Sequence, residues 1–90
     1  MAKKRARIDI ITDMLSSIQN KGGEIKPTHL MYKSNLSHGQ LVSYLDELLE
    51  KELVKKVKKK EYDYIILTDK GFSLLSRLKE MVEFEKTFGL

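Results

Sequence analysis

The residues around Ser37 form a complete start signal for a helix. Ser37 and Gln40 have the spacing of a capping box, in which each side chain satisfies a free backbone N–H group of the first turn. Leu36 and Leu41 flank this box as a hydrophobic staple. Leucines then continue at helical spacing, at Leu45, Leu48 and Leu49. A helix that begins at Ser37 and buries its leucine face is therefore predicted.

A short helix is predicted directly before this one. Pro27 suits the first turn of a helix, which favours a helix over residues 27–34 with Leu30 and Met31 facing inward. Only Asn35-Leu36 separates it from Ser37. Two helices joined by so short a turn form a helix-turn-helix, whose second helix can enter the major groove of DNA.

Five lysines follow, between two segments with strand-like composition. Residues 53–57 and 62–67 are rich in β-branched and aromatic side chains, and residues 58–61 are expected to join them. The lysines are Lys55, Lys56, Lys58, Lys59 and Lys60. A β-hairpin with a basic tip beside a helix-turn-helix has the arrangement of a DNA-binding wing.

The rest of the chain completes an α+β, mainly α fold. Apolar spacing at Ile8, Ile11, Leu15 and Ile18 predicts a first helix over residues 5–20, and a short extended piece follows at 24–26. Thr68 begins a last helix that runs to about Lys86. The predicted order is helix, short strand, helix, helix, β-hairpin wing, helix. We expect residues 1–68 to form a winged helix-turn-helix DNA-binding domain and residues 69–90 to form a C-terminal dimerisation helix.

Charge is concentrated in two short stretches. Residues 1–7 hold four basic side chains and residues 53–60 hold five, with no acid in either stretch, whereas the rest of the chain holds eight basic and all 13 acidic residues. Basic patches on an acidic body favour a polyanionic partner. The chain has no cysteine, no signal-peptide pattern and no apolar run of about 20 residues. A cytoplasmic protein without membrane contact is therefore expected, nucleoid-associated if its role is in chromatin.

The segment from Thr28 to Gly71 contains several short motifs. They are Met31-Tyr32, Asn35-Leu36-Ser37, Tyr44-Leu45, and Leu67-Thr68 with Lys70-Gly71. In these motifs the chain resembles a family of small archaeal winged helix-turn-helix proteins. The resemblance implies a dimeric DNA-binding protein, a transcriptional regulator or chromatin protein, paired through a C-terminal antiparallel coiled coil. His29 and His38 stand where that family usually has an arginine and an aromatic residue.

The candidate DNA contacts fall into three groups. The start of the second helix of the helix-turn-helix is expected to face base edges, through Ser37, His38, Gly39, Gln40 and Ser43. The five wing lysines are expected to contact the DNA backbone, as are Lys3, Lys4, Arg5, Arg7, Lys33 and Ser34. Two alternatives stay open at this point: Gln40 can be committed to its capping box, and His38 can be half-buried. Asp46, Glu47 and Glu50 lie farther along the outward face, so only the first turn and a half of this helix can dock.

The last helix is apolar on more than one side. Its combined apolar stripe is wider than the ~100° needed to cover one core, which favours a second copy of the helix as an antiparallel partner across a twofold axis. The alternative is one thick core contact with a frayed end. The expected interface comprises Leu74, Leu78, Met81, Val82, Phe84 and Phe88.

Other function classes have little support in the sequence. The two histidines lie nine residues apart on different predicted helices, without a carboxylate at ligand or triad spacing, so neither a metal site nor an enzyme is predicted. No cofactor or small-molecule substrate is expected. The main alternative is a winged-helix module that binds other proteins through its acidic helix face, without direct DNA contact.

Overall fold

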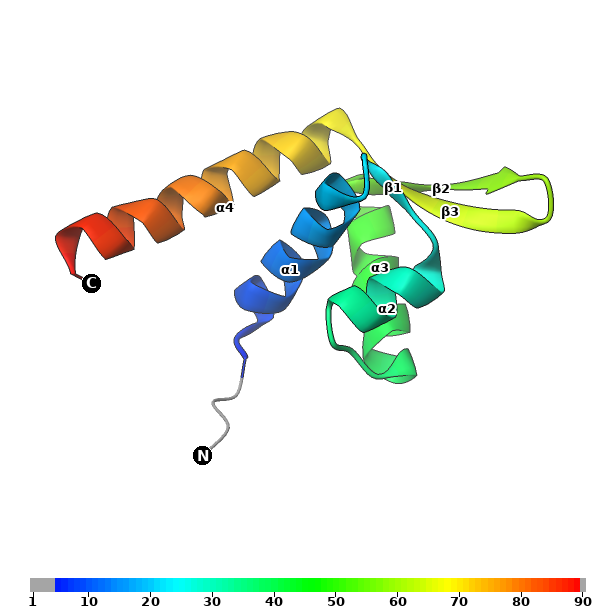
Figure 1. The fold of residues 1–90 in the computed structure, drawn as a ribbon, viewed down its shortest axis with the longest axis horizontal. Coiled ribbons are helices and arrows are strands. Elements are labelled where there is room, and N and C mark those ends of the chain that lie inside the picture. Colours follow the sequence, from blue (N-terminus) through cyan, green and yellow to red (C-terminus); the bar gives the residue numbers. More distant parts are fainter. Residues whose placement is uncertain (1–4, 90) are drawn as a thin grey trace.

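The computed structural model describes residues 5–89, which form four helices and one antiparallel sheet (Figure 1). The helices are α1 (Arg7–Asn20), α2 (Pro27–Lys33), α3 (His38–Glu50) and α4 (Asp69–Phe88). The strands are β1 (Glu24–Ile25), β2 (Val54–Lys59) and β3 (Tyr62–Leu67), in the sheet order β1-β3-β2. The predicted element order and the α+β, mainly helical class are confirmed.

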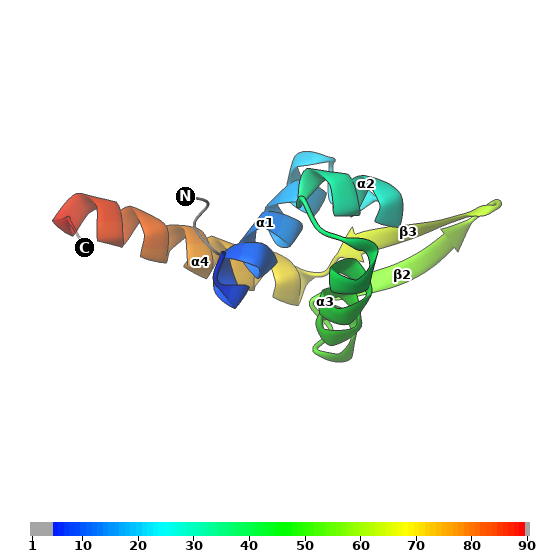
Figure 2. The same cartoon turned by 90° about the horizontal axis from the view of Figure 1, so that it is seen from below.

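The core lies between the helices and the inner face of the sheet. Met14, Leu15 and Ile18 of α1 are fully buried there, together with Ile65 of β3. Leu75 and Leu78 of α4 belong to the same core, so the first half of α4 packs as part of the body. From Lys79 to Gly89 every residue is exposed, and this half of α4 extends away from the body on the side opposite the hairpin (Figures 1 and 2).

The predicted helix starts at Ser37 and Thr68 are confirmed. The Ser37 hydroxyl accepts a hydrogen bond from the backbone N–H of Gln40 (3.2 Å), and the backbone N–H of Ser37 donates to Oε1 of Gln40 (3.0 Å). The Thr68 hydroxyl accepts from the backbone N–H of Gly71 (3.0 Å) and donates to the carbonyl of Glu52 (2.7 Å). The Thr68 cap therefore also ties the start of α4 to the chain just before β2.

The first helix differs from its prediction at its N-terminal end. It begins at Arg7 rather than Arg5, because Asp9 accepts a hydrogen bond from the backbone N–H of Ala6 (3.1 Å) and thereby caps the helix there. Ile8 was expected to face inward but is 48% exposed. It lies in the first turn, where no other described element covers it. The last helix ends at Phe88, slightly beyond the predicted Lys86.

The hairpin has a shorter turn than predicted. Residues 58–61 were expected to form the connection, but pairing continues to Lys58↔Asp63 and Lys59↔Tyr62. Only Lys60 and Glu61 remain in the turn, and Lys60 adopts a left-handed conformation (φ 56°). Lysine has a low strand propensity, but an opposite-charge pair and a Lys–Tyr pair across the strands favour continued pairing. The wing is therefore a long, narrow ribbon.

Candidate nucleic-acid interface

The wing lysines do not form a single patch, because β2 directs them to both faces of the sheet. Residues that pair directly across two strands share a face, and successive residues alternate. Lys56 pairs with Ile65 and Lys58 with Asp63, on the same face as the buried Val54. This inner face is the one toward the helices. Lys56 and Lys58 therefore lie on the side of the hairpin that holds the helix-turn-helix.

Lys55 and Lys59 lie on the outer face of the sheet. Lys59 forms an ion pair with Glu24 (Nζ to Oε2, 2.6 Å) and lies 5.6 Å from the centre of the Tyr64 ring. On the same face, Nζ of Lys26 lies 4.0 Å from the centre of the Tyr62 ring. These cation–π contacts and the ion pair engage Lys59 and Lys26 with their own sheet, whereas Lys55 is exposed. Lys60, in the turn, is exposed at the tip.

The first turn of α3 is open to solvent. Ser37, His38, Gly39, Gln40 and Ser43 are all exposed, so the half-buried alternative for His38 does not hold. No atom lies within 4 Å of the position that a Cβ would take at Gly39, so the backbone is accessible there. Oε1 of Gln40 is committed to the capping box. A bidentate contact with adenine uses both the oxygen and the nitrogen of this amide, so it would have to share Oε1 with the box.

The second half of α3 carries acidic side chains on its outward side. Asp46 and Glu50 are exposed, whereas Glu47 is partly buried and forms ion pairs with Arg7 and, at 3.8 Å, with Lys51. Asp46 and Glu50 have no ion pair among residues 5–89, and such carboxylates repel a phosphate backbone. Such repulsion would disfavour close approach of a phosphate backbone to this half of the helix.

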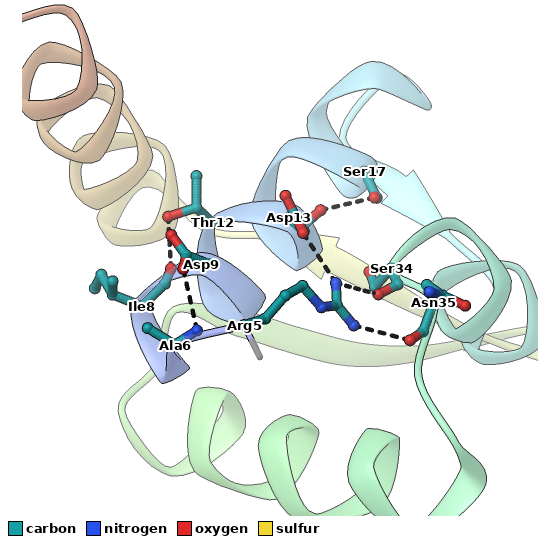
Figure 3. A network of polar contacts seen from close by, with 9 residues as sticks. All are labelled: Arg5, Ala6, Ile8, Asp9, Thr12, Asp13, Ser17, Ser34 and Asn35. Carbon is teal, nitrogen blue, oxygen red and sulfur yellow. Dashed lines mark hydrogen bonds and ion pairs between the residues drawn. The ribbon is translucent and has the colours of Figure 1, made fainter. Parts of the chain in front are cut away.

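Arg5 holds the turn between α2 and α3 against α1 (Figure 3). Its Nη1 donates to Oδ2 of Asp13 (3.0 Å) and to the carbonyl of Ser34 (2.8 Å), and its Nη2 donates to the carbonyl of Asn35 (2.8 Å). Asn35 has a left-handed backbone (φ 54°), which turns the chain into α3. The guanidinium was expected to contact DNA phosphate, but its donors bind the protein itself. Sequence reasoning missed this role, since the partners lie about 30 positions away.

The other residues that were predicted to contact the DNA backbone differ in their surroundings. Ser34 is only 1% exposed and its hydroxyl has no hydrogen-bond partner among the described residues, so its predicted phosphate contact is wrong. Arg7 is exposed but paired with Glu47. Lys33 is exposed at the end of α2, beside the turn. Lys3 and Lys4 lie outside the described residues.

This geometry agrees with the comparison to known protein families. The family described as winged helix-turn-helix matches residues 4–86, which is nearly the whole chain. The chain belongs to the winged helix-turn-helix family. An uncharacterized protein of the archaeon Methanocaldococcus jannaschii is 35% identical over 78 residues, which are 87% of this chain. The match spans only 34% of that longer protein.

Solved structures of other DNA-binding proteins share the fold. Sso10a-2, a DNA-binding protein from Sulfolobus solfataricus, has a TM-score of 0.80 at 18% identity, covering 93% of this chain and 85% of that one. F93 from STIV, a winged-helix DNA-binding protein, has a TM-score of 0.76 at 21% identity, covering 93% of this chain and 95% of that one. The likeness to both includes the C-terminal part of this chain, because each match covers more than nine-tenths of it.

The predicted dimer residues of this winged helix-turn-helix protein divide into two groups. Leu78 is buried in the core of its own protomer and Leu74 packs against that core. Burial of Leu78 contradicts its assignment to the dimer interface, because the core of its own protomer already encloses it. The other four side chains are exposed: Met81 by 56%, Val82 by 44%, Phe84 by 57% and Phe88 by 65%. The ring centres of Phe84 and Phe88 are 4.7 Å apart.

Residues 5–89 lack two further features that would bear on function. No group of three or more potential metal-ligating side chains lies together in this range. None of its helices is both long and apolar enough to cross a lipid bilayer.

Replacing Arg5 with alanine tests its place at the turn. The loss of three charge-assisted hydrogen bonds is expected to lower the free energy of unfolding by about 1–2 kcal/mol, measured by chemical denaturation. DNA affinity is expected to fall while the slope of log affinity against log salt stays the same, because no phosphate contact is removed. Arg5→Lys keeps the charge but loses the forked donor geometry, so it is expected to behave like alanine. A reduced slope, restored by lysine, would instead assign Arg5 to phosphate.

Proposed function

We propose that this protein binds double-stranded DNA as a homodimer and acts as a transcriptional regulator or chromatin-associated protein in the cytoplasm. If its role is in chromatin, we expect the protein to be nucleoid-associated. The observation that supports DNA binding best is the placement of Lys56 and Lys58 on the inner face of the wing, on the same side of the sheet as the open first turn of α3. The DNA-binding proteins Sso10a-2 and F93 share this fold.

In the proposed complex, phosphate contacts supply most of the affinity. Lys56 and Lys58 on the wing, Lys60 at its tip and Lys33 beside the turn are exposed cations, and base contacts are limited to the first turn of α3. No arginine lies in that turn, and Gln40 is held by its capping box. Base reading is therefore left mainly to His38 and Ser43, which favours modest sequence preference.

The homodimer is supported by the free half of α4. Met81, Val82, Phe84 and Phe88 expose large apolar side chains on one projecting helix. Monomeric proteins rarely expose a contiguous apolar surface of this kind, and a second copy of the helix would cover it. A dimer would also present two wings at a fixed spacing.

A fluorescence-anisotropy titration of a random duplex over a series of salt concentrations tests the DNA-binding proposal. Four phosphate contacts per protomer predict a slope of log affinity against log salt of about −7 for a dimer. Competition between a candidate operator and bulk DNA then separates a specific repressor from an architectural protein. Weak binding without salt dependence would contradict the proposal.

That negative result would favour a protein-interaction module. The exposed Asp46 and Glu50 give α3 an acidic outward side that a basic protein partner could recognise. Neither function requires a cofactor, a metal ion or a catalytic residue.

A further inference from the structure

One face of α4 has a palindromic arrangement of side chains around Met81. Leu74 and Phe88 lie seven residues before and after Met81, and Arg77 and Glu85 lie four residues before and after it. Steps of three and four residues keep all five side chains on one side of a helix. Along this face the order is therefore apolar, basic, apolar, acidic, apolar.

A groove lies beside the first half of this face. It runs between the end of α3 and α4, and its lining residues are Lys51, Leu53, Lys70, Ser73, Leu74 and Arg77. Leu53 and Leu74 supply apolar surface, and three cations surround them. The groove therefore suits an apolar side chain carried on a negatively charged segment.

The far end of α4 is such a segment. Over residues 80–88 three glutamates, Glu80, Glu83 and Glu85, outnumber the one lysine, Lys86, and the side chain of Phe88 is exposed. Gly89 caps the end of the helix in a left-handed conformation (φ 70°), and the last carbonyls of a helix form the negative end of its dipole. The cations of the groove and the negative charge of the helix end are complementary.

We propose that the groove receives the end of α4 from a second copy of this chain, with the two Met81 side chains facing each other on the twofold axis. This inference rests on the homodimer proposed above and gives it a register. An antiparallel second helix centred on Met81 places the partner subunit's Phe88 over Leu74 and the partner subunit's Glu85 opposite Arg77. Apolar residues then meet apolar residues, and each basic residue meets an acid.

The docking reaches beyond the two helices to the end of α3. Lys51 is the C-terminal cap residue of α3, and Nζ of Lys70 donates to its carbonyl (2.9 Å). Both lysines lie in the groove that would receive the partner's helix end. Each α3 is thereby held in a fixed orientation relative to the twofold axis.

Charge reversal across the proposed pair tests the register. Arg77→Glu and Glu85→Arg are each expected to raise the dimer dissociation constant about tenfold, measured by sedimentation equilibrium, because each places like charges together at two symmetric contacts. The double variant Arg77→Glu with Glu85→Arg is expected to return to within about threefold of the original value. The matched control combines Arg77→Glu with Glu83→Arg. Glu83 lies on the other side of α4, so no rescue is expected.

Single cysteines give a second, independent measurement, because the chain has none of its own. Met81→Cys is expected to form a disulfide-linked dimer on mild oxidation. Phe88→Cys is expected to stay unlinked, because 14 residues at a rise of about 1.5 Å separate the two Phe88 positions by roughly 21 Å in this register.

The possible failures can be told apart. An original chain that sediments as a monomer at tens of micromolar would refute the homodimer and this inference together. A stable dimer without charge rescue and without Met81→Cys linkage would refute only the register. Linkage through Phe88→Cys would indicate parallel helices and would also overturn it.

Discussion

Replacing Lys56 and Lys58 with glutamate is expected to weaken the binding of duplex DNA about hundredfold at near-physiological salt. Each change removes a phosphate contact and adds a repulsive carboxylate on the inner face of the wing. A dimer loses four contacts, so the slope of log affinity against log salt should fall in magnitude by about 3 to 4. Anisotropy titrations of several unrelated duplexes should show the same loss, because phosphate contacts carry no sequence information.

The matched control is Lys55→Glu with Lys59→Glu. These residues belong to the same strand and give the same change in net charge, but they lie on the outer face. The expected loss of affinity is within about fivefold, from the weaker long-range attraction of the whole protein. Equal losses in the two double variants would show that only net charge matters. Thermal unfolding of both variants checks that the hairpin is intact, because Lys59→Glu also removes the ion pair with Glu24.

Gly71→Ala is expected to lower the free energy of unfolding by about 2–3 kcal/mol. A Cβ at Gly71 would lie 2.2 Å from the carbonyl oxygen of Leu53 and 2.6 Å from a methyl group of Leu67. The Leu53 carbonyl accepts a hydrogen bond from the backbone N–H of Thr68 (3.2 Å), so it cannot move without disturbing the start of α4. In a domain of this size the melting temperature should fall by roughly 10–20 °C, measured by circular dichroism.

Gly39→Ala serves as the comparison within the same chain. Gly39 is also helical, but nothing surrounds the position of its added methyl group. Alanine there is expected to leave stability unchanged or to raise it by up to about 1 kcal/mol. A Gly71→Ala protein that melts at the original temperature would contradict the close packing of α4 against the backbone of Leu53, just before β2.

Local signals predicted most of the fold correctly. The capping box at Ser37 and the cap at Thr68 are made by residues within three positions of each other, so their spacing in the sequence is enough to find them. The start of α1 was placed too early because its cap is made by the side chain of Asp9 on the backbone of Ala6, without a favoured cap residue. The exposure of Ile8 depends on where the body ends, which periodicity cannot show.

Contacts that are distant in sequence account for most of the errors at the candidate site. Arg5 binds two carbonyls at the end of α2, and no local pattern distinguishes it from the basic residues around it. The division of the wing lysines between two faces depends on the register of β2 against β3. Lysines are poor strand formers, so composition predicted a longer turn and left this register open.

The capping box would also restrict how the proposed DNA preference of this protein can change. Gln40 serves the helix start and lies at the front of the surface proposed to meet base edges. Glutamate can close the same box but would place a carboxylate against the phosphates, and residues without a side-chain acceptor would leave the N–H of Ser37 unsatisfied. Glutamine is thus the residue that completes the box and stays uncharged. A mutational path toward a new target sequence would therefore begin at His38 or Ser43, since evolution at position 40 must trade binding against the integrity of α3.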